Sequence, residues 1–318
     1  MDGVLIVSKP SGPTSHDVVS VVRRRLGERR VGHAGTLDPM AEGVLVLLLG
    51  RATRLAEYIS GHDKEYEAGL LLGIATDTQD VEGKIVSEAS AADVTEESLS
   101  AVLDGFRGTI SQVPPMYSAV KVDGTRLYRM AREGKTVERQ PRAVTVRDLS
   151  LVSFSPGERA RAALKCTVSA GCYIRTLCAD IGQRLGVGGC MESLVRTASG
   201  PFLLKDAVTL SEIEKGSTAD VRARVLAPSE ALQDYPRVDL DASGSVLFCH
   251  GGYVLACADA PERPDRLVRV HGASGELLGM GEMEAGGERV RPLKVISDAS
   301  GVDAAGRREP AGPVVPEA

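Results

Sequence analysis

The order of the apolar segments limits most strongly what this chain of 318 residues can fold into. Strand-like patterns cover residues 4–7, 42–49, 64–72, 84–86, 144–154 and 160–169, and helix-like patterns cover residues 17–26, 98–106, 127–133 and 174–185. The two kinds of segment do not alternate strictly, as they do in doubly wound proteins. The pattern therefore predicts an α+β fold with a mixed, largely antiparallel central sheet flanked by helices.

The last quarter of the chain has a different texture. Short apolar runs lie between glycine-rich turns at residues 246–248, 253–256, 267–270, 277–280 and 290–295. This spacing is typical of a small β-barrel, which we expect at residues 237–296, after a first domain at residues 1–232. Residues 297–318 are rich in Gly, Pro and Ala, and we expect a disordered tail there.

Composition excludes several classes of protein. Aromatic residues make up only 3% of the chain, with no Trp, so the core must be aliphatic. The longest apolar run, residues 44–49, is too short to cross a membrane, and the first residues lack the pattern of a secretion signal. The six cysteines form no C-x-x-C pair and the five histidines show no metal-ligand spacing. We expect a cytoplasmic protein with reduced thiols, no metal and no organic cofactor.

Charge is distributed unevenly along the chain. The formal net charge is −5, yet residues 116–147 contain eight basic residues and only three acidic ones, and residues 23–30 form a second basic cluster. Solvated helix faces would account for both clusters. The alternative is a set of phosphate contacts along a nucleic acid.

One loop has the composition of a catalytic segment. Residues 32–45 read GHAGTLDPMAEGVL, in which Asp38 lies between glycines and is followed by Pro39. The proline stiffens the turn, and the small neighbours leave the carboxylate open to a substrate. An aspartate that only closes a turn is the alternative.

The motif and four others resemble those of the TruB-type bacterial tRNA pseudouridine synthases, in the same order. The other four are VSKPSGPTS at residues 7–15, DKEY at residues 63–66, QVPPMYSAVK at residues 112–121 and GCYIRTL at residues 171–177. The resemblance implies the pseudouridine-synthase fold with a C-terminal PUA-like RNA-binding domain. It also implies that the chain isomerises uridine 55 in the T-loop of tRNA, on a flipped-out nucleotide and without a cofactor.

The resemblance assigns roles to three catalytic residues. Asp38 is the essential carboxylate, which would attack the sugar, attack the base or assist proton removal from the sugar. Arg175 pairs with Asp38 and keeps it ionised and oriented, because a guanidinium matches a carboxylate in geometry. Tyr66 would stack on the uracil, and its hydroxyl would take part in removing the C5 proton. A surface ion pair for Arg175 and an ordinary strand tyrosine for Tyr66 are the alternatives.

Five further residues are implied in substrate binding. His33 fills the space of the extruded base, and Tyr173 and Leu194 line the uracil pocket, although core packing explains Leu194 nearly as well. Lys9 supports the catalytic loop or contacts RNA, and Asp80 hydrogen-bonds to RNA or to basic side chains near the site.

The expected partner is tRNA. The basic insertion at residues 116–147 would clamp the T-arm and the PUA-like domain would reach the acceptor end, with the chain acting as a monomer that needs no protein partner. Three alternatives remain at this point: an RNA-binding protein without catalysis, a hydrolase such as a glycosidase, which usually needs two facing carboxylates, and a relative that modifies ribosomal RNA within a larger particle.

Overall fold

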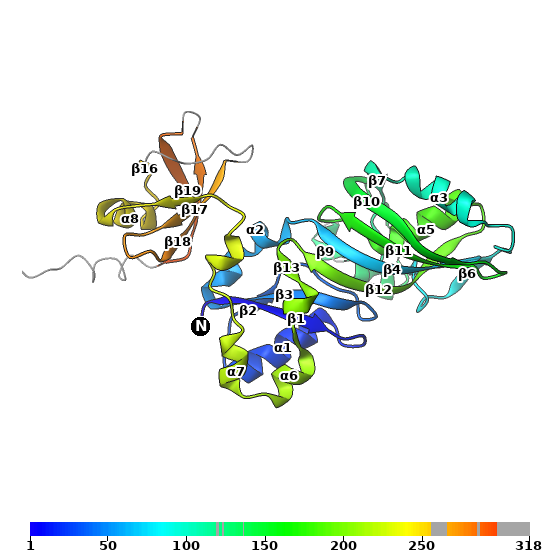
Figure 1. Cartoon of the computed structure of the whole chain (residues 1–318), viewed down its shortest axis with the longest axis horizontal. Helices are drawn as coiled ribbons and strands as arrows, with labels where there is room; N and C mark the ends of the chain where they lie inside the picture. Colours follow the sequence, from blue (N-terminus) through cyan, green and yellow to red (C-terminus); the bar gives the residue numbers. More distant parts are fainter. Residues whose placement is uncertain (119–120, 123, 136, 256–265, 285–286, 298–318) are drawn as a thin grey trace, which may run out of the picture.

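A mixed sheet of ten strands forms the main body of the molecule (Figure 1). The computed structural model describes residues 1–118, 121–122, 124–135, 137–255, 266–284 and 287–297. The main path of the sheet runs β14-β1-β3-β12-β4-β11-β10-β7, with β2 on β3 and β13 on β12. The strands are β1 (Gly3–Lys9), β2 (Val31–His33), β3 (Glu42–Leu49), β4 (Lys64–Leu72), β7 (Gly108–Gln112), β10 (Arg142–Ser155), β11 (Arg161–Val168), β12 (Gly189–Ser199), β13 (Phe202–Leu203) and β14 (Val208–Thr209).

The predicted α+β class is confirmed. Only two pairs of this sheet, β1 with β14 and β12 with β3, are parallel, and its other pairs are antiparallel. The helices are α1 (Ser15–Leu26), α2 (Ala56–Ser60), α3 (Glu96–Asp104), α4 (Leu127–Arg132), α5 (Ile174–Arg184), α6 (Leu210–Lys215), α7 (Thr218–Ala223) and α8 (Ala242–Cys249), with 3-10 turns at Gly50–Leu55, Leu204–Asp206 and Glu230–Leu232. Two small hairpins are added, β5 (Ile74–Thr76) with β6 (Ile85–Glu88), and β8 (Lys121–Val122) with β9 (Thr125–Arg126).

Strand β3 shows how the sheet is buried on both faces. Leu45, Leu47 and Leu49 belong to one apolar cluster, whereas Val44 and the other alternate residues belong to a second cluster on the opposite face. Successive side chains of a strand point to opposite faces, so a continuous apolar run fits a central strand. Helix α1 covers the first cluster, together with α6 and α7.

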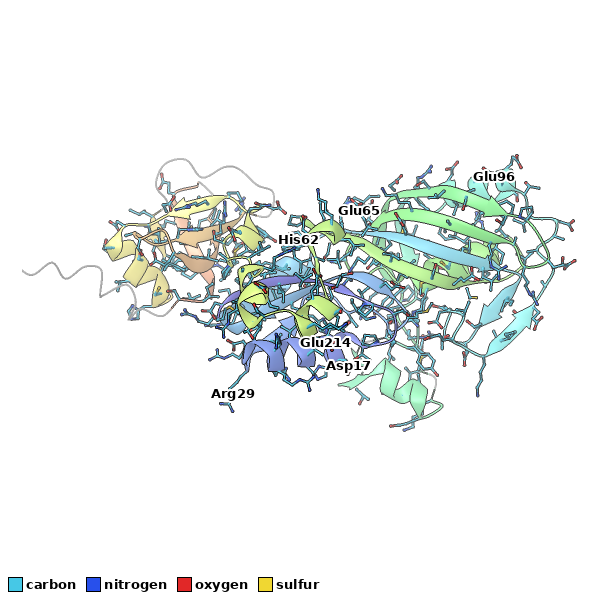
Figure 2. The ribbon with its side chains drawn as sticks, turned by 60° about the horizontal axis from the view of Figure 1, so that its bottom comes forward. Asp17, Arg29, His62, Glu65, Glu96 and Glu214 are labelled. Carbon is cyan, nitrogen blue, oxygen red and sulfur yellow. The ribbon has the colours of Figure 1, made fainter. Side chains whose placement is uncertain are left out.

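Helix α1 begins and ends with strong local signals. Thr14 accepts a hydrogen bond from the Asp17 amide at 3.1 Å, and the Asp17 carboxylate accepts one from the Thr14 amide at 2.9 Å. Such a capping box satisfies amide groups that a helix start leaves unpaired. The last turn carries Arg23, Arg24 and Arg25, whose positive charges interact favourably with the negative end of the helix dipole and stabilise the helix. Figure 2 labels Asp17 near the start of α1 and Arg29 beyond its end.

The C-terminal part forms a second, curled sheet of five strands in the order β15-β17-β18-β19-β16 (Figure 1). The strands are β15 (Arg237–Asp239), β16 (Val254–Leu255), β17 (Leu267–His271), β18 (Leu277–Met283) and β19 (Arg289–Val295). One expected strand is wrong, because residues 246–248 lie in α8, whose start Asp241 caps by accepting from the Gly244 amide at 2.7 Å. Apart from Ser297, the expected tail lies outside the described residues. No helix in the described ranges is long and apolar enough to span a bilayer.

Gly43 is required where β3 meets β12. Its φ is 99°, and an added Cβ would lie 2.2 Å from the Arg196 carbonyl oxygen. We expect Gly43→Ala to lower the free energy of unfolding by roughly 2–5 kcal/mol, through strained φ and overpacking. Gly12→Ala is the matched control, since its φ is 107° and no heavy atom lies within 4 Å of the added Cβ; it should cost only about 1–2 kcal/mol. Equal losses in urea unfolding would contradict the close-approach explanation.

Candidate functional site

The loop between β2 and β3 holds Asp38 through its neighbours. The Ser15 hydroxyl donates to the Leu37 carbonyl at 2.9 Å and accepts from the Leu37 amide, also at 2.9 Å. The Ala41 amide donates to the Asp38 carbonyl at 3.1 Å, which closes the turn after Pro39. These bonds fix the backbone on both sides of Asp38, whose side chain stays 35% exposed and thus open to a ligand.

Lys9 stabilises this loop through hydrogen bonds to its backbone. It is fully buried, and its amine donates to the carbonyls of Pro10, Pro39 and Ala41 at 2.8, 2.9 and 2.6 Å. Burial lowers the pKa of Lys9 to about 8, while Glu42 and Asp38 act in the opposite direction. An ammonium group supplies all three donors that the carbonyls use. The contacts favour loop support over a direct contact of Lys9 with RNA.

Replacing Lys9 by Met should therefore loosen the catalytic loop. Three carbonyls lose their donor, that of Ala41 in a buried position, and we expect the free energy of unfolding to fall by roughly 2–4 kcal/mol. Lys205→Met is the control, because Lys205 is exposed and should change stability by no more than about 0.5 kcal/mol. Chemical denaturation of both variants measures the difference, and similar stabilities would contradict the proposed role of Lys9.

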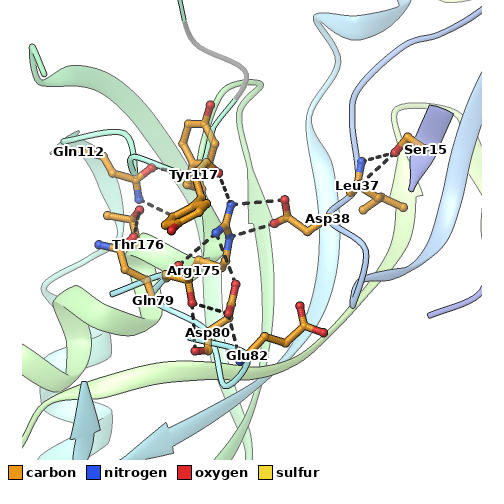
Figure 3. A network of polar contacts seen from close by, with 12 residues as sticks. Ser15, Leu37, Asp38, Gln79, Asp80, Glu82, Gln112, Tyr117, Arg175 and Thr176 are labelled. Carbon is orange, nitrogen blue, oxygen red and sulfur yellow. Dashed lines mark hydrogen bonds and ion pairs between the residues drawn. The ribbon is translucent and has the colours of Figure 1, made fainter. Parts of the chain in front are cut away.

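Arg175 joins two carboxylates at the start of α5 (Figure 3). Its Nε lies 2.9 Å from Asp38 Oδ2 and its Nη2 lies 3.3 Å from Asp38 Oδ1. Its Nη1 lies 3.4 Å from Asp80 Oδ2 and donates to the Thr78 carbonyl at 3.0 Å. The Tyr117 carbonyl accepts from Nη2 at 2.7 Å. The guanidinium is 5% exposed, so it is held on several sides in a largely water-free position.

The two carboxylates differ in accessibility. The Asp80 side chain is 7% exposed, lies behind the guanidinium and accepts from the Thr78 hydroxyl at 2.6 Å. Burial raises the pKa of Asp38 above its usual value, an effect that the Arg175 guanidinium opposes. Asp38 is therefore a more basic carboxylate than an exposed aspartate, and the one that a ligand reaches more easily.

The turn that presents Asp80 is built by residues that the sequence did not single out. Gln79 has a φ of 65°, which is uncommon for a residue with a side chain. Its carboxamide oxygen accepts from the Thr176 hydroxyl at 2.7 Å, one residue after Arg175. The Thr76 hydroxyl donates to the Asp80 carbonyl at 2.6 Å. Strained backbone held by surrounding bonds is common at functional sites.

Tyr66 and Leu194 lie on neighbouring central strands, β4 and β12. They are 8% and 7% exposed and share one apolar cluster with Leu37, the residue before Asp38. His33 is half-buried at the end of β2, where the loop begins. The fold thus brings these three expected substrate-binding residues to strands beside the Asp38 loop, while their roles stay predictions.

Tyr173 is fixed by a residue that sequence reasoning missed. The Gln112 carboxamide donates to the Tyr173 carbonyl at 3.1 Å and accepts from the Tyr173 amide at 2.8 Å. Burial raises the pKa of the Tyr173 hydroxyl, and the charges of Arg175 and Asp38 also act on it. Tyr173 is the residue before α5 and stands two positions before Arg175, so Gln112 also fixes the start of the helix that carries Arg175. Gln112 begins the motif at residues 112–121, but the sequence gives no sign that its side chain bonds to Tyr173.

Arg196 is the second missed residue. It lies on β12 between β3 and β4, is 1% exposed, and donates to the carbonyls of Val44 and Gly35 at 2.7 and 3.0 Å. The sequence gives no signal for it beyond an arginine in a segment of mixed polarity. Among the described residues, no group of three or more His, Cys, Asp or Glu side chains is arranged to hold a metal.

Comparison with known families covers nearly the whole chain. Residues 23–174 match the N-terminal domain of the TruB family of pseudouridylate synthases. Residues 175–233 match the C-terminal domain of tRNA pseudouridylate synthase B, and residues 236–296 match the C-terminal region of pseudouridine synthase II TruB.

Individual relatives agree with these matches. A tRNA pseudouridine synthase B from an Azoarcus species is 43% identical over 302 residues, which cover 95% of this chain and 97% of the relative. That of Symbiobacterium thermophilum is 51% identical over 251 residues, covering 79% and 82%. Among solved structures, a chain in a crystal structure of a Cbf5-Nop10-Gar1 complex is 28% identical, with a TM-score of 0.72, covering 94% of this chain and 86% of its own.

Proposed function

The chain belongs to the TruB family of pseudouridylate synthases, and we infer that it isomerises uridine 55 in the T-loop of tRNA to pseudouridine. One observation carries the assignment of the site. Asp38 is a partly exposed carboxylate that a buried guanidinium holds through two nitrogen–oxygen contacts. Asp38 and Arg175 lie in two of the motifs that carry the family resemblance, at residues 32–45 and 171–177.

The reaction needs few groups from the protein. The bond between ribose C1′ and uracil N1 breaks, the uracil turns, and a bond forms between C1′ and C5; the proton leaves C5 and N1 gains one. In our proposal Asp38 supplies the negative charge or nucleophile for this exchange, and Arg175 keeps it ionised and oriented. Tyr66 stacks on the ring and its hydroxyl assists the removal of the C5 proton.

The remaining residues bind the extruded nucleotide. Tyr173 and Leu194 line the uracil pocket, and His33 occupies the space that the base leaves in the RNA. Taking a base out of its stack costs a few kcal/mol. Asp80 and Lys9 act on protein groups, since each is almost fully buried and bonded to the loop or to Arg175.

We propose that the insertion at residues 116–147 clamps the T-arm. The start of the insertion contacts the site, because the Tyr117 carbonyl accepts a hydrogen bond from Arg175. The Arg139 guanidinium, near the end of the insertion, donates to the Pro114 carbonyl at 3.0 Å. Phosphate contacts from its basic residues would offset part of the cost of flipping. Limited proteolysis with and without tRNA tests this proposal. Protection within the insertion supports it, and unchanged cleavage there contradicts it.

In this proposal the two sheets have different roles. Residues 1–232 carry the chemistry, and residues 237–296 reach the acceptor end of tRNA. In this proposal the chain acts as a monomer without an obligatory protein partner. A tRNA substrate agrees with the cytoplasmic location expected from the sequence.

The purified chain alone tests this function. It is incubated with an unmodified tRNA transcript, and pseudouridine is mapped by carbodiimide modification and primer extension. We expect one pseudouridine, at the T-loop uridine, and none there in a transcript with cytidine at that position. The absence of product at this uridine would contradict both the assigned activity and the independence from protein partners.

A further inference from the structure

Arg196 is a buried cation for which the structure describes no ion pair. It is 1% exposed, and within the described ranges no carboxylate lies close enough to pair with it. Burying a charged group without a counter-ion is costly, so such a residue needs compensating hydrogen bonds. A Met or Leu at this position would fill the core without that cost. A charged side chain with several donors at this buried position therefore indicates a role beyond filling the core.

Its donors reach the catalytic loop. Nε donates to the Val44 carbonyl at 2.7 Å and Nη2 donates to the Gly35 carbonyl at 3.0 Å. Gly35 stands three residues before Asp38, and Val44 begins the apolar part of the strand that leaves the loop. The backbone of Arg196 pairs with Gly43, whose lack of a side chain permits the close approach. Arg196 thus holds the loop at Gly35 and Val44, on either side of Leu37, which Ser15 holds.

The same residue faces the tyrosine. Arg196 and Tyr66 are direct partners in the antiparallel pair of β12 and β4, so their side chains share one face of the sheet. Leu194, two residues earlier on β12, points to that face as well. Burial raises the pKa of the Tyr66 hydroxyl, while the positive charge of Arg196 acts in the opposite direction. The register of the two strands therefore places the guanidinium and the phenol next to each other on one face of the sheet.

We propose that Arg196 is a positioning residue for the isomerisation. It keeps the Tyr66 hydroxyl and the Gly35–Asp38 loop in fixed positions relative to each other. In the reacting complex the guanidinium would donate to the phenol oxygen, so that the phenol keeps its own O–H for the uracil ring. Because a guanidinium presents five donors in a rigid plane, it serves the loop and the tyrosine at once. A lysine ammonium is a single point and does not span both. This inference rests on the function proposed above.

The test is a double-mutant cycle between Arg196 and Tyr66. We expect Arg196→Lys to slow the single-turnover formation of pseudouridine by about 10- to 100-fold at saturating tRNA, with the dissociation constant for tRNA changed by less than about 2-fold. In the Tyr66→Phe background the same substitution should slow the reaction by less than about 3-fold, because the hydroxyl through which it acts is already missing. The pH profile of the rate should also shift upward at its basic side in Arg196→Lys, and only when Tyr66 is present.

Two controls separate this role from general damage. Arg161→Lys changes an arginine on β11, two strands away from β12, whose side chain pairs with Glu192 at 2.9 Å, and it should leave rate and pH profile unchanged. Thermal unfolding shows which variants are folded at the assay temperature; if Arg196→Lys is not, Arg196→Gln replaces it in the cycle. A full, multiplicative loss in the Tyr66→Phe background would overturn the proposal, as would an unaltered rate. A wild-type chain that forms no pseudouridine instead contradicts the function itself.

Discussion

Asp38→Asn should abolish pseudouridine formation and leave the protein folded and able to bind tRNA. Asparagine has nearly the same shape but carries no negative charge, so it neither stabilises positive charge on the ribose nor attacks as a nucleophile. We expect the single-turnover rate to fall by at least about 10⁴-fold. Binding should change little, because most affinity for a structured RNA comes from phosphate contacts elsewhere.

The control for this substitution is a surface aspartate outside the candidate site. Asp104 ends α3, is 64% exposed and pairs with Arg107 at 2.5 Å. Asp104→Asn should retain the wild-type rate, because exposed ion pairs contribute only about 1 kcal/mol or less to stability. An Asp38→Asn variant that kept a rate within about tenfold of the wild type would show that the carboxylate is not essential.

Arg175→Met should have the second largest effect, on both stability and rate. The substitution leaves the Asp80 carboxylate, 7% exposed, without its cation. Removing one partner of a buried ion pair costs roughly 3–5 kcal/mol. It also frees Asp38 from the contacts that orient it, so we expect the rate to fall by about 10²-fold or more in the folded fraction.

Urea unfolding and single-turnover kinetics separate the two effects. Arg161→Met is the matched control, since the Arg161 side chain is 56% exposed and its removal should change the free energy of unfolding by no more than about 0.5 kcal/mol. Arg175→Lys should recover part of the stability but little of the rate, because an ammonium does not bridge both carboxylates. Equal stability of Arg175→Met and Arg161→Met would contradict the role assigned to the buried network.

The sequence predicted best the elements that carry strong local signals. The expected segments at residues 42–49 and 64–72 coincide with β3 and β4, because their apolar patterns leave little choice of register. Helix α1 follows from Thr14 and Asp17, whose capping geometry is set within four residues. The strand predicted at residues 246–248 was wrong, because three apolar residues in a row do not distinguish a strand from a helix.

Long-range pairing limited what the sequence could give. Strand β12 escaped prediction, since Glu192, Ser193 and Arg196 interrupt its apolar pattern. Its position between β3 and β4 makes it a strand, and that position is fixed only in the folded chain. The motifs named Asp38 and Arg175, but the contacts of Arg175 with the Asp80 turn span 95 positions of the chain and arise from the topology.

The structure of Asp38→Asn bound to an unmodified T-arm RNA tests the central claim most directly. The account predicts that the target uridine leaves its stack and lies on Tyr66, with the side chain at position 38 in contact with the nucleoside and still beside Arg175. A uridine that remained stacked in the RNA, or that was bound away from position 38, would contradict it.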